Sequence, residues 1–303
     1  MALTFYIVKK WALTFIGRNS FNCNQDEGKC YSKNEVKGYY NNLTEKITKF
    51  GLPDNQLPKT QISGKICKEF SIDIFQYGIA AYDLYLMTNE TQYLDKLKAC
   101  AEWALTKQLP NGAWEAFSHK KPDIPQSAMA QGEAISMLIR AYQVFKDSRY
   151  LDIITKAKDF MLKPVEEGGT TVYIESKPYF YEYINEPLVL NGWIFSAWGL
   201  YDYAKFFNDD NVMMIWQKTV DAMAEKLPEY DYGDWSLYSD NGRSLANPFY
   251  HKLHIAQLNV MYDLTGKEEF LKYSKIFQSY QANIWYRVKT FIKKIIVKIK
   301  EKE

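Results

Sequence analysis

One stretch of the sequence, residues 234–254, concentrates side chains that can transfer protons or bind anions. It reads DWSLYSDNGRSLANPFYHKLH, and glycines and a proline interrupt it, so we expect a loop or hairpin over most of its length. Ionisable side chains on a loop that a helical scaffold supports are a common way to build a site. The alternative is a polar surface hairpin. The candidates in this stretch are Tyr238, Arg243, Tyr250, His251 and His254.

The end of this stretch predicts the start of a helix. Asn247 is a suitable N-cap, and Pro248 fits the first helical position. His251 and His254 would then share one face of that helix. A histidine pair without a nearby carboxylate ligand is a weak zinc signal, so we expect no metal. The pair either lies in the core or binds a substrate carboxylate, as Arg243 also can, and the core alternative is favoured.

A second candidate group is a glutamate between tyrosines. Glu182 lies between Tyr181 and Tyr183, and partial desolvation there would raise its pKa toward that of a useful base. The alternative is a surface glutamate beside half-buried tyrosines. Gln131 and Asn191 fall near the beginnings of two predicted helices, where they either bind sugar hydroxyls or pack helices together.

Composition narrows the class of protein. The chain has 303 residues, of which 47% are hydrophobic and 24% charged, as in a globular protein with a sizeable core. The net charge of +2 gives no argument for nucleic-acid binding. Twenty-four Tyr, 17 Phe and 8 Trp suit a carbohydrate cleft or an aromatic-rich helical core.

The sequence also leads us to expect a cytoplasmic protein, or one peripheral at the inner membrane face. The four cysteines match no usual zinc spacing and are expected to be reduced thiols. We see no cleavable signal peptide and no run of about 18 apolar residues.

Four loosely repeated units of paired helices are predicted between residues 75 and 280. Each unit has an apolar helix, a short turn, an amphipathic helix and a glycine-bearing connection. This alternation predicts an all-α fold, an α/α toroid of paired helices with short β-hairpin connections. The alternative is an open helical solenoid, but Trp193 and Trp198 are too large and apolar to line an open groove.

Three parts of the chain are expected: residues 1–36, 37–282 and 283–303. The first is a basic amphipathic helix with a loop, its apolar face formed by Phe5, Val8, Trp11 and Phe15. The second is the toroid. The third is a basic amphipathic helix of a kind that lies on anionic membrane surfaces, unless it docks on the protein's own core.

Several segments together resemble a known family. SAMAQGEAISMLIRAY, YEY, LNGW and LYSDNGRSLANPFYHKLHIAQL occur in the order found in the C-terminal catalytic domain of the D-glucuronyl C5-epimerases. The resemblance runs from about Phe75 to Tyr280. It implies an α/α toroid without cofactors that binds a uronic acid polysaccharide and converts glucuronate to iduronate in heparan-type chains. It places the family's glutamate at Glu182 and its two tyrosines at Tyr238 and Tyr250.

The implied reaction takes a proton from C5, α to a carboxylate, and returns one to the opposite face of the ring. Glu182 is the expected base and Tyr250 the expected acid, because tyrosine has a reference pKa of about 10. Tyr238 can assist either group. A uronate lyase begins with the same proton abstraction, and a non-catalytic glycan-binding protein is a third alternative.

Two features depart from the family pattern. Arg243 is separated from Tyr238 by SDN and a glycine, whereas the family's arginine follows its tyrosine closely. Fewer than about seventy residues precede the toroid, too few for the β-rich domains of the animal enzymes. Either the cleft is more open, or a partner chain in a homodimer completes it, or the substrate is smaller.

Overall fold

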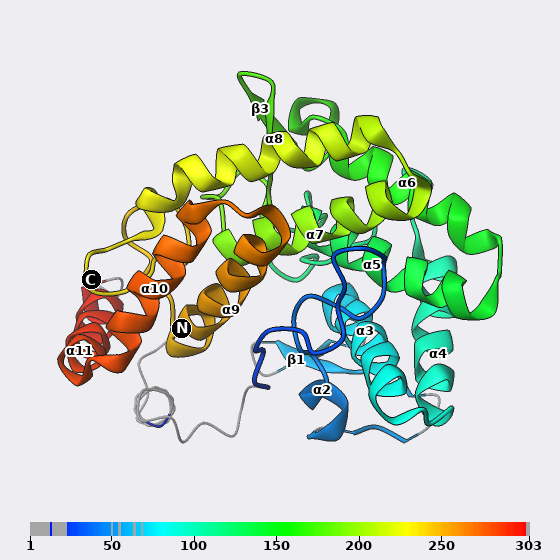
Figure 1. Ribbon diagram of the computed structural model, residues 1–303, viewed down its shortest axis with the longest axis horizontal. Coiled ribbons are helices and arrows are strands. Elements are labelled where there is room, and N and C mark those ends of the chain that lie inside the picture. Colours follow the sequence, from blue (N-terminus) through cyan, green and yellow to red (C-terminus); the bar gives the residue numbers. More distant parts are fainter. Residues whose placement is uncertain are drawn as a thin grey trace. The chain divides into compact units, whose positions relative to one another are not determined.

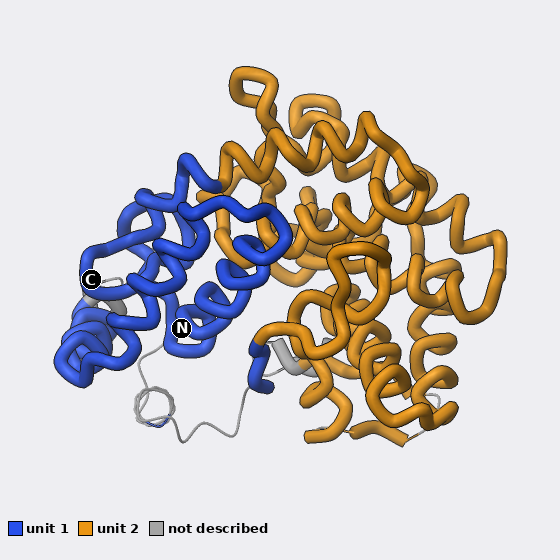
Figure 2. The backbone as a smooth tube through the Cα atoms, in the orientation of Figure 1, with its two compact units in different colours: residues 1–26, 224–303 blue, residues 27–223 orange. Residues whose placement is uncertain are grey.

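The computed structural model describes residue 13 and residues 23–300, apart from 50, 54–55, 63–64 and 68. The predicted N-terminal helix therefore lies, except for residue 13, outside the described residues. The chain forms two compact units, which Figure 2 colours separately. Unit 2 comprises residues 27–223, and unit 1 comprises residues 1–26 and 224–303.

Unit 2 consists of helix pairs with two short hairpins (Figure 1). The hairpins β1–β2 and β3–β4 are antiparallel. Helices α3, α5 and α7 pack side by side, while α4 lies against α3 and α6 against α5. The elements are α2 Glu45–Thr48, β1 Thr60–Ile62, β2 Lys65–Cys67, α3 Ser71–Thr88, α4 Gln92–Lys107, α5 Ala128–Phe145, α6 Arg149–Leu162, η1 Val165–Glu167, β3 Thr171–Ile174, β4 Lys177–Phe180, α7 Leu190–Phe207 and α8 Asp210–Lys226, whose last residues belong to unit 1.

Unit 1 continues the same pattern. Helices α9 and α10 form a packed pair, and α11 contacts α10. The side chain of Asn247 caps α9 by accepting the amide N–H of Tyr250 at 2.9 Å, with Pro248 in the first turn, so the predicted helix start is confirmed. The elements are η2 Leu227–Tyr230, α9 Pro248–Thr265, α10 Glu268–Ala282 and α11 Ile284–Lys300.

The first helix of each pair repeats one local structure. Helices α3, α5, α7 and α9 are each 18 residues long, follow a residue in extended conformation and end at a left-handed residue. A glycine meets the left-handed conformation without a Cβ penalty, and asparagine tolerates it better than most residues. The left-handed residues are Asn89, Lys146, Asn208 and Gly266.

The apolar first helices are buried on most sides, as their composition predicts. Every residue of α7 from Leu190 to Ala204 is buried, whereas α4 and α6 alternate buried and exposed positions. Two glycines let α5 and α7 approach closely, because a Cβ on Gly199 would lie 2.2 Å from the carbonyl oxygen of Gly132. The predicted all-α class is confirmed, as are the short hairpin connections.

A buried charged cluster lies in the core of unit 2. Arg140 donates to the carboxylate of Asp202 at 2.6 Å and to the carbonyl of Gly38 at 3.0 Å, and both charged side chains are fully buried. Tyr40 donates to the other oxygen of Asp202 at 2.7 Å. Residues 38–40, ahead of the helix pairs in sequence, are therefore part of the core that joins α5 to α7.

In the described part of the chain, no helix is long and apolar enough to cross a membrane. Cys30 and Cys100 are free thiols.

Candidate functional site

The loop that carries Glu182 is fixed to the first turns of two helices. The amide N–H of Ala128, at the start of α5, donates to the carbonyl of Tyr181 at 2.9 Å. A Cβ on Gly192, in the first turn of α7, would lie 2.5 Å from Oε2 of Glu182. The glycine of the LNG sequence therefore leaves room for the carboxylate at that helix start.

Two physical effects oppose each other at Glu182. Its side chain is only 5% exposed, and burial penalises the carboxylate anion. The N-terminal end of α7 carries a partial positive charge and favours that anion. Glu182 therefore combines low exposure with a position beside a helix N-terminus, an arrangement that suits a carboxylate that must accept a proton from carbon.

Gln131 and Asn191 lie where the sequence placed them, in the first turns of α5 and α7. Gln131 is fully buried, and neither its amide oxygen nor its amide nitrogen has a hydrogen-bond partner among the described residues. An unsatisfied buried polar group costs roughly 1 to 3 kcal/mol, so natural proteins keep few of them without a reason. Asn191 is 3% exposed.

Tyr183 joins the Glu182 loop to the connection between α4 and α5. Its ring lies 4.2 Å from that of Phe117, centroid to centroid, and the ammonium of Lys120 lies 5.3 Å from the Tyr183 centroid. Lys121 forms an ion pair with Glu186 on the same two segments. Tyr181 and Tyr183 are both partly buried.

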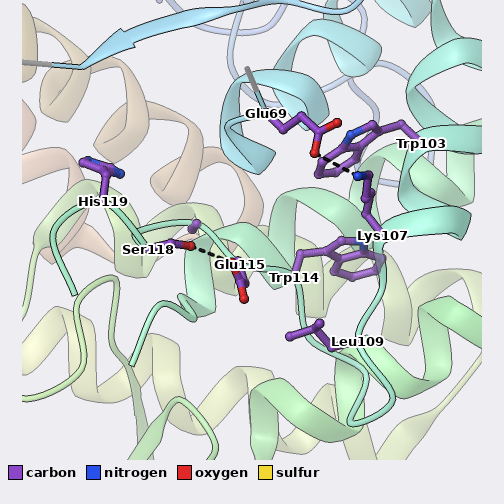
Figure 3. A pocket seen from close by; sticks show the side chains of 9 residues that line it. Glu69, Trp103, Lys107, Leu109, Trp114, Glu115, Ser118 and His119 are labelled. Atoms are coloured by element: carbon purple, nitrogen blue, oxygen red, sulfur yellow. Dashed lines mark hydrogen bonds and ion pairs between the residues drawn. The ribbon is translucent and has the colours of Figure 1, made fainter. Parts of the chain in front are cut away.

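The same α4–α5 connection forms one wall of a pocket in unit 2, shown in Figure 3. The pocket has a volume of about 250 Å³. Lys107 forms an ion pair with Glu69 at 2.9 Å, and Ser118 donates to Glu115 at 2.7 Å. Two tryptophans and His119 complete the polar and aromatic lining; the tryptophans are Trp103 and Trp114.

The pocket adjoins the Glu182 loop through aromatic contacts. The ring of Phe117 lies between two neighbours, 6.2 Å from His119 and 4.2 Å from Tyr183. Burial, followed by the charge of Lys120, lowers the pKa of His119 below its usual value. The pocket was missed in the sequence. Its available signal was a tryptophan, a glutamate and a histidine within six residues of one connection, WEAFSH.

In unit 1, the structure brings Tyr238 and Tyr250 together as a pair. Their ring centroids lie 4.8 Å apart, and both rings are partly buried. Tyr238 belongs to a short hairpin in which its amide N–H donates to the carbonyl of Ser244 at 2.6 Å. Tyr250 lies in the first turn of α9. Both tyrosines pack against a small cluster formed by Trp235, Leu237, Leu245 and Ala246.

The two histidines of α9 are fully buried and share one hydroxyl. Oγ of Ser236 lies 2.8 Å from Nδ1 of His251 and 3.1 Å from Nδ1 of His254. Nε2 of His251 lies 3.0 Å from the carbonyl of Phe277, so it carries a proton and donates. Burial lowers the pKa of both histidines to about 3. The pair is therefore neutral, and the geometry agrees with the core alternative.

These contacts determine which ring nitrogen of each histidine carries the proton. With its proton on Nε2, neutral His251 accepts at Nδ1, where both the amide and the hydroxyl of Ser236 reach it. His254 must then donate from Nδ1 to that hydroxyl. Since α9 also carries Tyr250, the histidines anchor the helix turn that follows the tyrosine.

Arg243 lies at the exposed tip of the hairpin, next to Gly242 with its left-handed φ of 68°. Its amide N–H donates to the side chain of Asn241 at 3.0 Å, which shapes the turn. No group of three or more His, Cys, Asp or Glu side chains in the described ranges is arranged to hold a metal ion.

These features define an all-α protein of paired helices with candidate ionisable side chains beside the first turns of α7 and α9. The chain belongs to the D-glucuronyl C5-epimerase C-terminus family, whose model matches residues 111–279, more than half of the chain. The matched range includes Glu182, Tyr238 and Tyr250.

Two relatives extend the comparison. The chain is 28% identical over 192 residues to a D-glucuronyl C5-epimerase from Caenorhabditis elegans, in an alignment that covers 54% of this chain and 31% of that protein. It is 32% identical over 156 residues to an uncharacterized protein from Methanocaldococcus jannaschii, covering half of each. The alignments thus span about a third of the length of the C. elegans protein and half of the length of the M. jannaschii protein.

Proposed function

We propose that this protein is a glucuronyl C5-epimerase that converts D-glucuronate to L-iduronate within a heparosan- or heparan-like chain. One observation carries the proposal: the family match spans a buried glutamate at a helix start and a pair of contacting tyrosines, and these are the groups the reaction needs. The all-α fold supports it, and we propose that the four helix pairs close into an α/α toroid.

In this mechanism Glu182 is the base. Its carboxylate takes the C5 proton, and the electron pair moves into the adjacent carboxylate of the sugar to give an enediolate-like intermediate. The N-terminus of α7 supports the ionised form before the transfer, and the low exposure limits competing hydration. Gly192 is the residue that permits this position.

Tyr250 is the acid in this mechanism. Its hydroxyl donates a proton to the other face of C5, and the resulting phenolate is reprotonated from solvent. Tyr238, whose ring contacts that of Tyr250, assists by orienting the hydroxyl or by sharing the developing charge. Gln131, Asn191, Tyr181, Tyr183 and Arg243 are proposed to bind sugar hydroxyls or the carboxylate, while His251 and His254 hold the start of α9.

The pocket beside Tyr183 is proposed to hold a neighbouring sugar of the chain. Two carboxylates and one lysine give it a negative balance, with His119 neutral, so it does not select an anion. Hydroxyl or amino groups fit the carboxylates, and the aromatic walls fit a sugar ring. A polymer in which a uronate alternates with a neutral or amino sugar meets both requirements.

The test is to incubate the protein with a glucuronate polymer in deuterated water. An epimerase incorporates deuterium at C5, forms iduronate and leaves the chain length unchanged. An ultraviolet-absorbing unsaturated product with shortened chains would instead identify a lyase. Glycan binding without exchange or cleavage would identify a non-catalytic glycan-binding protein.

A further inference from the structure

Helix α11 has two different faces. One face is docked on unit 1: Thr290 is fully buried, and Phe291 packs against the cluster that also contacts Tyr238 and Tyr250. The ring of Tyr286 lies 5.5 Å from that of Tyr280 on α10. Figure 1 shows the helix beside α10. The docked alternative of the sequence analysis thus describes one side of this helix.

The other face is an exposed apolar stripe. Apart from the adjacent residues 284 and 285, its residues follow one another at intervals of three or four, which places them on one side of a helix. Trp285 is 77% exposed, although a tryptophan in a folded domain is highly buried on average. Half of the large exposed hydrophobic side chains in the described ranges belong to this stripe, which comprises Ile284, Trp285, Val288, Ile292 and Ile296.

The helix that carries the stripe is strongly basic in sequence. Residues 284–300 contain six Lys or Arg and no Asp or Glu. Lys289 and Lys293 both contact the carboxylate of Asp234, at 2.5 and 2.9 Å. Six cations less this one carboxylate leave a formal charge of +5. The Asp234 contacts fix the rotation of the helix, because they hold the docked face against unit 1 and leave the stripe outward.

We propose that the exposed stripe of α11 binds an anionic lipid bilayer, with the helix lying in the plane of the interface. Apolar side chains with an interfacial tryptophan and flanking lysines are the features of such helices. Anionic lipid attracts each nearby lysine, so the net positive charge of the helix adds to the apolar attraction of the stripe. A second copy of the chain fits the stripe less well, because pairing would bring two +5 helices together.

The experiment uses the full chain and sedimentation with vesicles of phosphatidylcholine, with and without phosphatidylglycerol. We expect binding to the mixed vesicles that weakens as salt is added. The variant Trp285→Ser/Ile292→Gln should reduce the partition coefficient at least about ten-fold, since it removes two large apolar contacts. Met214→Gln is the matched control, because Met214 is also an exposed apolar side chain but lies on α8. This control should bind like the unchanged protein.

Thermal unfolding and light scattering complete the test. Both substituted positions are exposed, so the double variant should melt with the unchanged protein, which excludes unfolding as the cause of lost binding. Equal vesicle binding by the double variant and the unchanged protein, or no binding of the unchanged protein to anionic vesicles, would overturn the proposal. A dimer that the double variant abolishes, together with absent lipid binding, would assign the stripe to a subunit interface instead.

Discussion

At the scale of single residues, Tyr250 separates a chemical role from a packing role. Tyr250→Phe removes one hydroxyl and keeps the ring that contacts Tyr238. General acid catalysis is worth about 10²- to 10⁴-fold, so C5 deuterium exchange should slow by that factor, or about 3 to 5 kcal/mol of transition-state stabilisation. Tyr262→Phe is the control: it makes the same chemical change on the same helix.

Exchange rates are read by mass spectrometry of the isolated uronate, with glycan binding and thermal unfolding measured alongside. Binding and stability should stay close to those of the unchanged protein. Near-normal exchange by Tyr250→Phe would mean that Tyr250 serves only as a packing ring, and the proton donor would then be sought at Tyr238.

Glu182 allows a test in two steps, by removing its charge and by displacing it. Glu182→Gln keeps the shape but cannot accept the proton, and exchange should fall by about 10²-fold or more. Gly192→Ala puts a methyl group 2.5 Å from the carboxylate and should slow exchange while the glutamate is still present. Glu186→Gln, on the same loop but exposed, is the control and should exchange normally. Unchanged exchange by Glu182→Gln would assign the base to another residue.

At the scale of helices and connections, the sequence predicted what local rules determine. The apolar first helices, the amphipathic second helices and the Asn247-Pro248 helix start follow from periodicity and capping, and all three are present. The sequence also singled out Tyr238 and Tyr250, which lie in contact.

The features that escaped prediction depend on partners distant in sequence. The rotation of α11 is fixed by Asp234, more than fifty residues earlier. The histidines of α9 are paired through Ser236, on the preceding hairpin. The pocket combines Glu69, before α3, with the α4–α5 connection. Periodicity carries no information on such pairings, because each requires the helix pairs to be already packed.

The buried histidines make the α9 segment sensitive to acid. Their pKa values of about 3 in the folded protein lie below the ordinary value of 6.5. The unfolded state therefore binds protons more readily than the folded state in this pH range. Their stabilising contribution is complete above pH 6.5 and is lost as the pH falls toward 3. By linkage, the free energy of unfolding of unit 1 should fall by about 2 kcal/mol per histidine when the pH is lowered from 7 to 5.

Hydrogen exchange, corrected for intrinsic rates, measures this loss as faster opening of α9 and α10 at pH 5. His119→Gln is the control, because this third histidine is exposed and belongs to unit 2. It should leave the pH response of α9 unchanged. Equal protection of α9 at pH 5 and pH 7 would contradict the prediction.

At the scale of the whole molecule, the two units should respond to pH in opposite directions. In unit 2, burial raises the pKa of Asp83 to about 7, against the lowering effect of Arg140 and beside the like charge of Asp202. This acid stabilises the folded state fully below pH 3.8 and loses that effect as the pH rises through 7. Acidification from pH 7 to pH 5 should therefore raise the stability of unit 2 through Asp83 and lower the stability of unit 1 through its histidines. We expect stepwise rather than single-step unfolding in mild acid.

The last prediction concerns how much of a glycan the molecule recognises. If the pocket beside Tyr183 binds a neighbouring sugar, a polymer should bind more tightly than a single uronide, because a single uronide has no second sugar to place in the pocket. Glu115→Gln removes a charged acceptor from the pocket and should raise KM for the polymer about ten-fold, because hydrogen bonds to charged groups are worth about 1.5 to 3 kcal/mol. The kcat should not change, since Glu115 is proposed to contact a sugar away from the reacting carbon.

Steady-state exchange on a polymer and on a single uronide separates this role from a structural one. Only the polymer KM should rise, whereas a distorted Glu182 loop would lower kcat for both substrates. Glu90→Gln is the matched control, because Glu90 is an exposed glutamate in the turn between α3 and α4. An unchanged polymer KM in Glu115→Gln would remove the pocket from the substrate path while leaving the roles of Glu182 and Tyr250 open to their own tests.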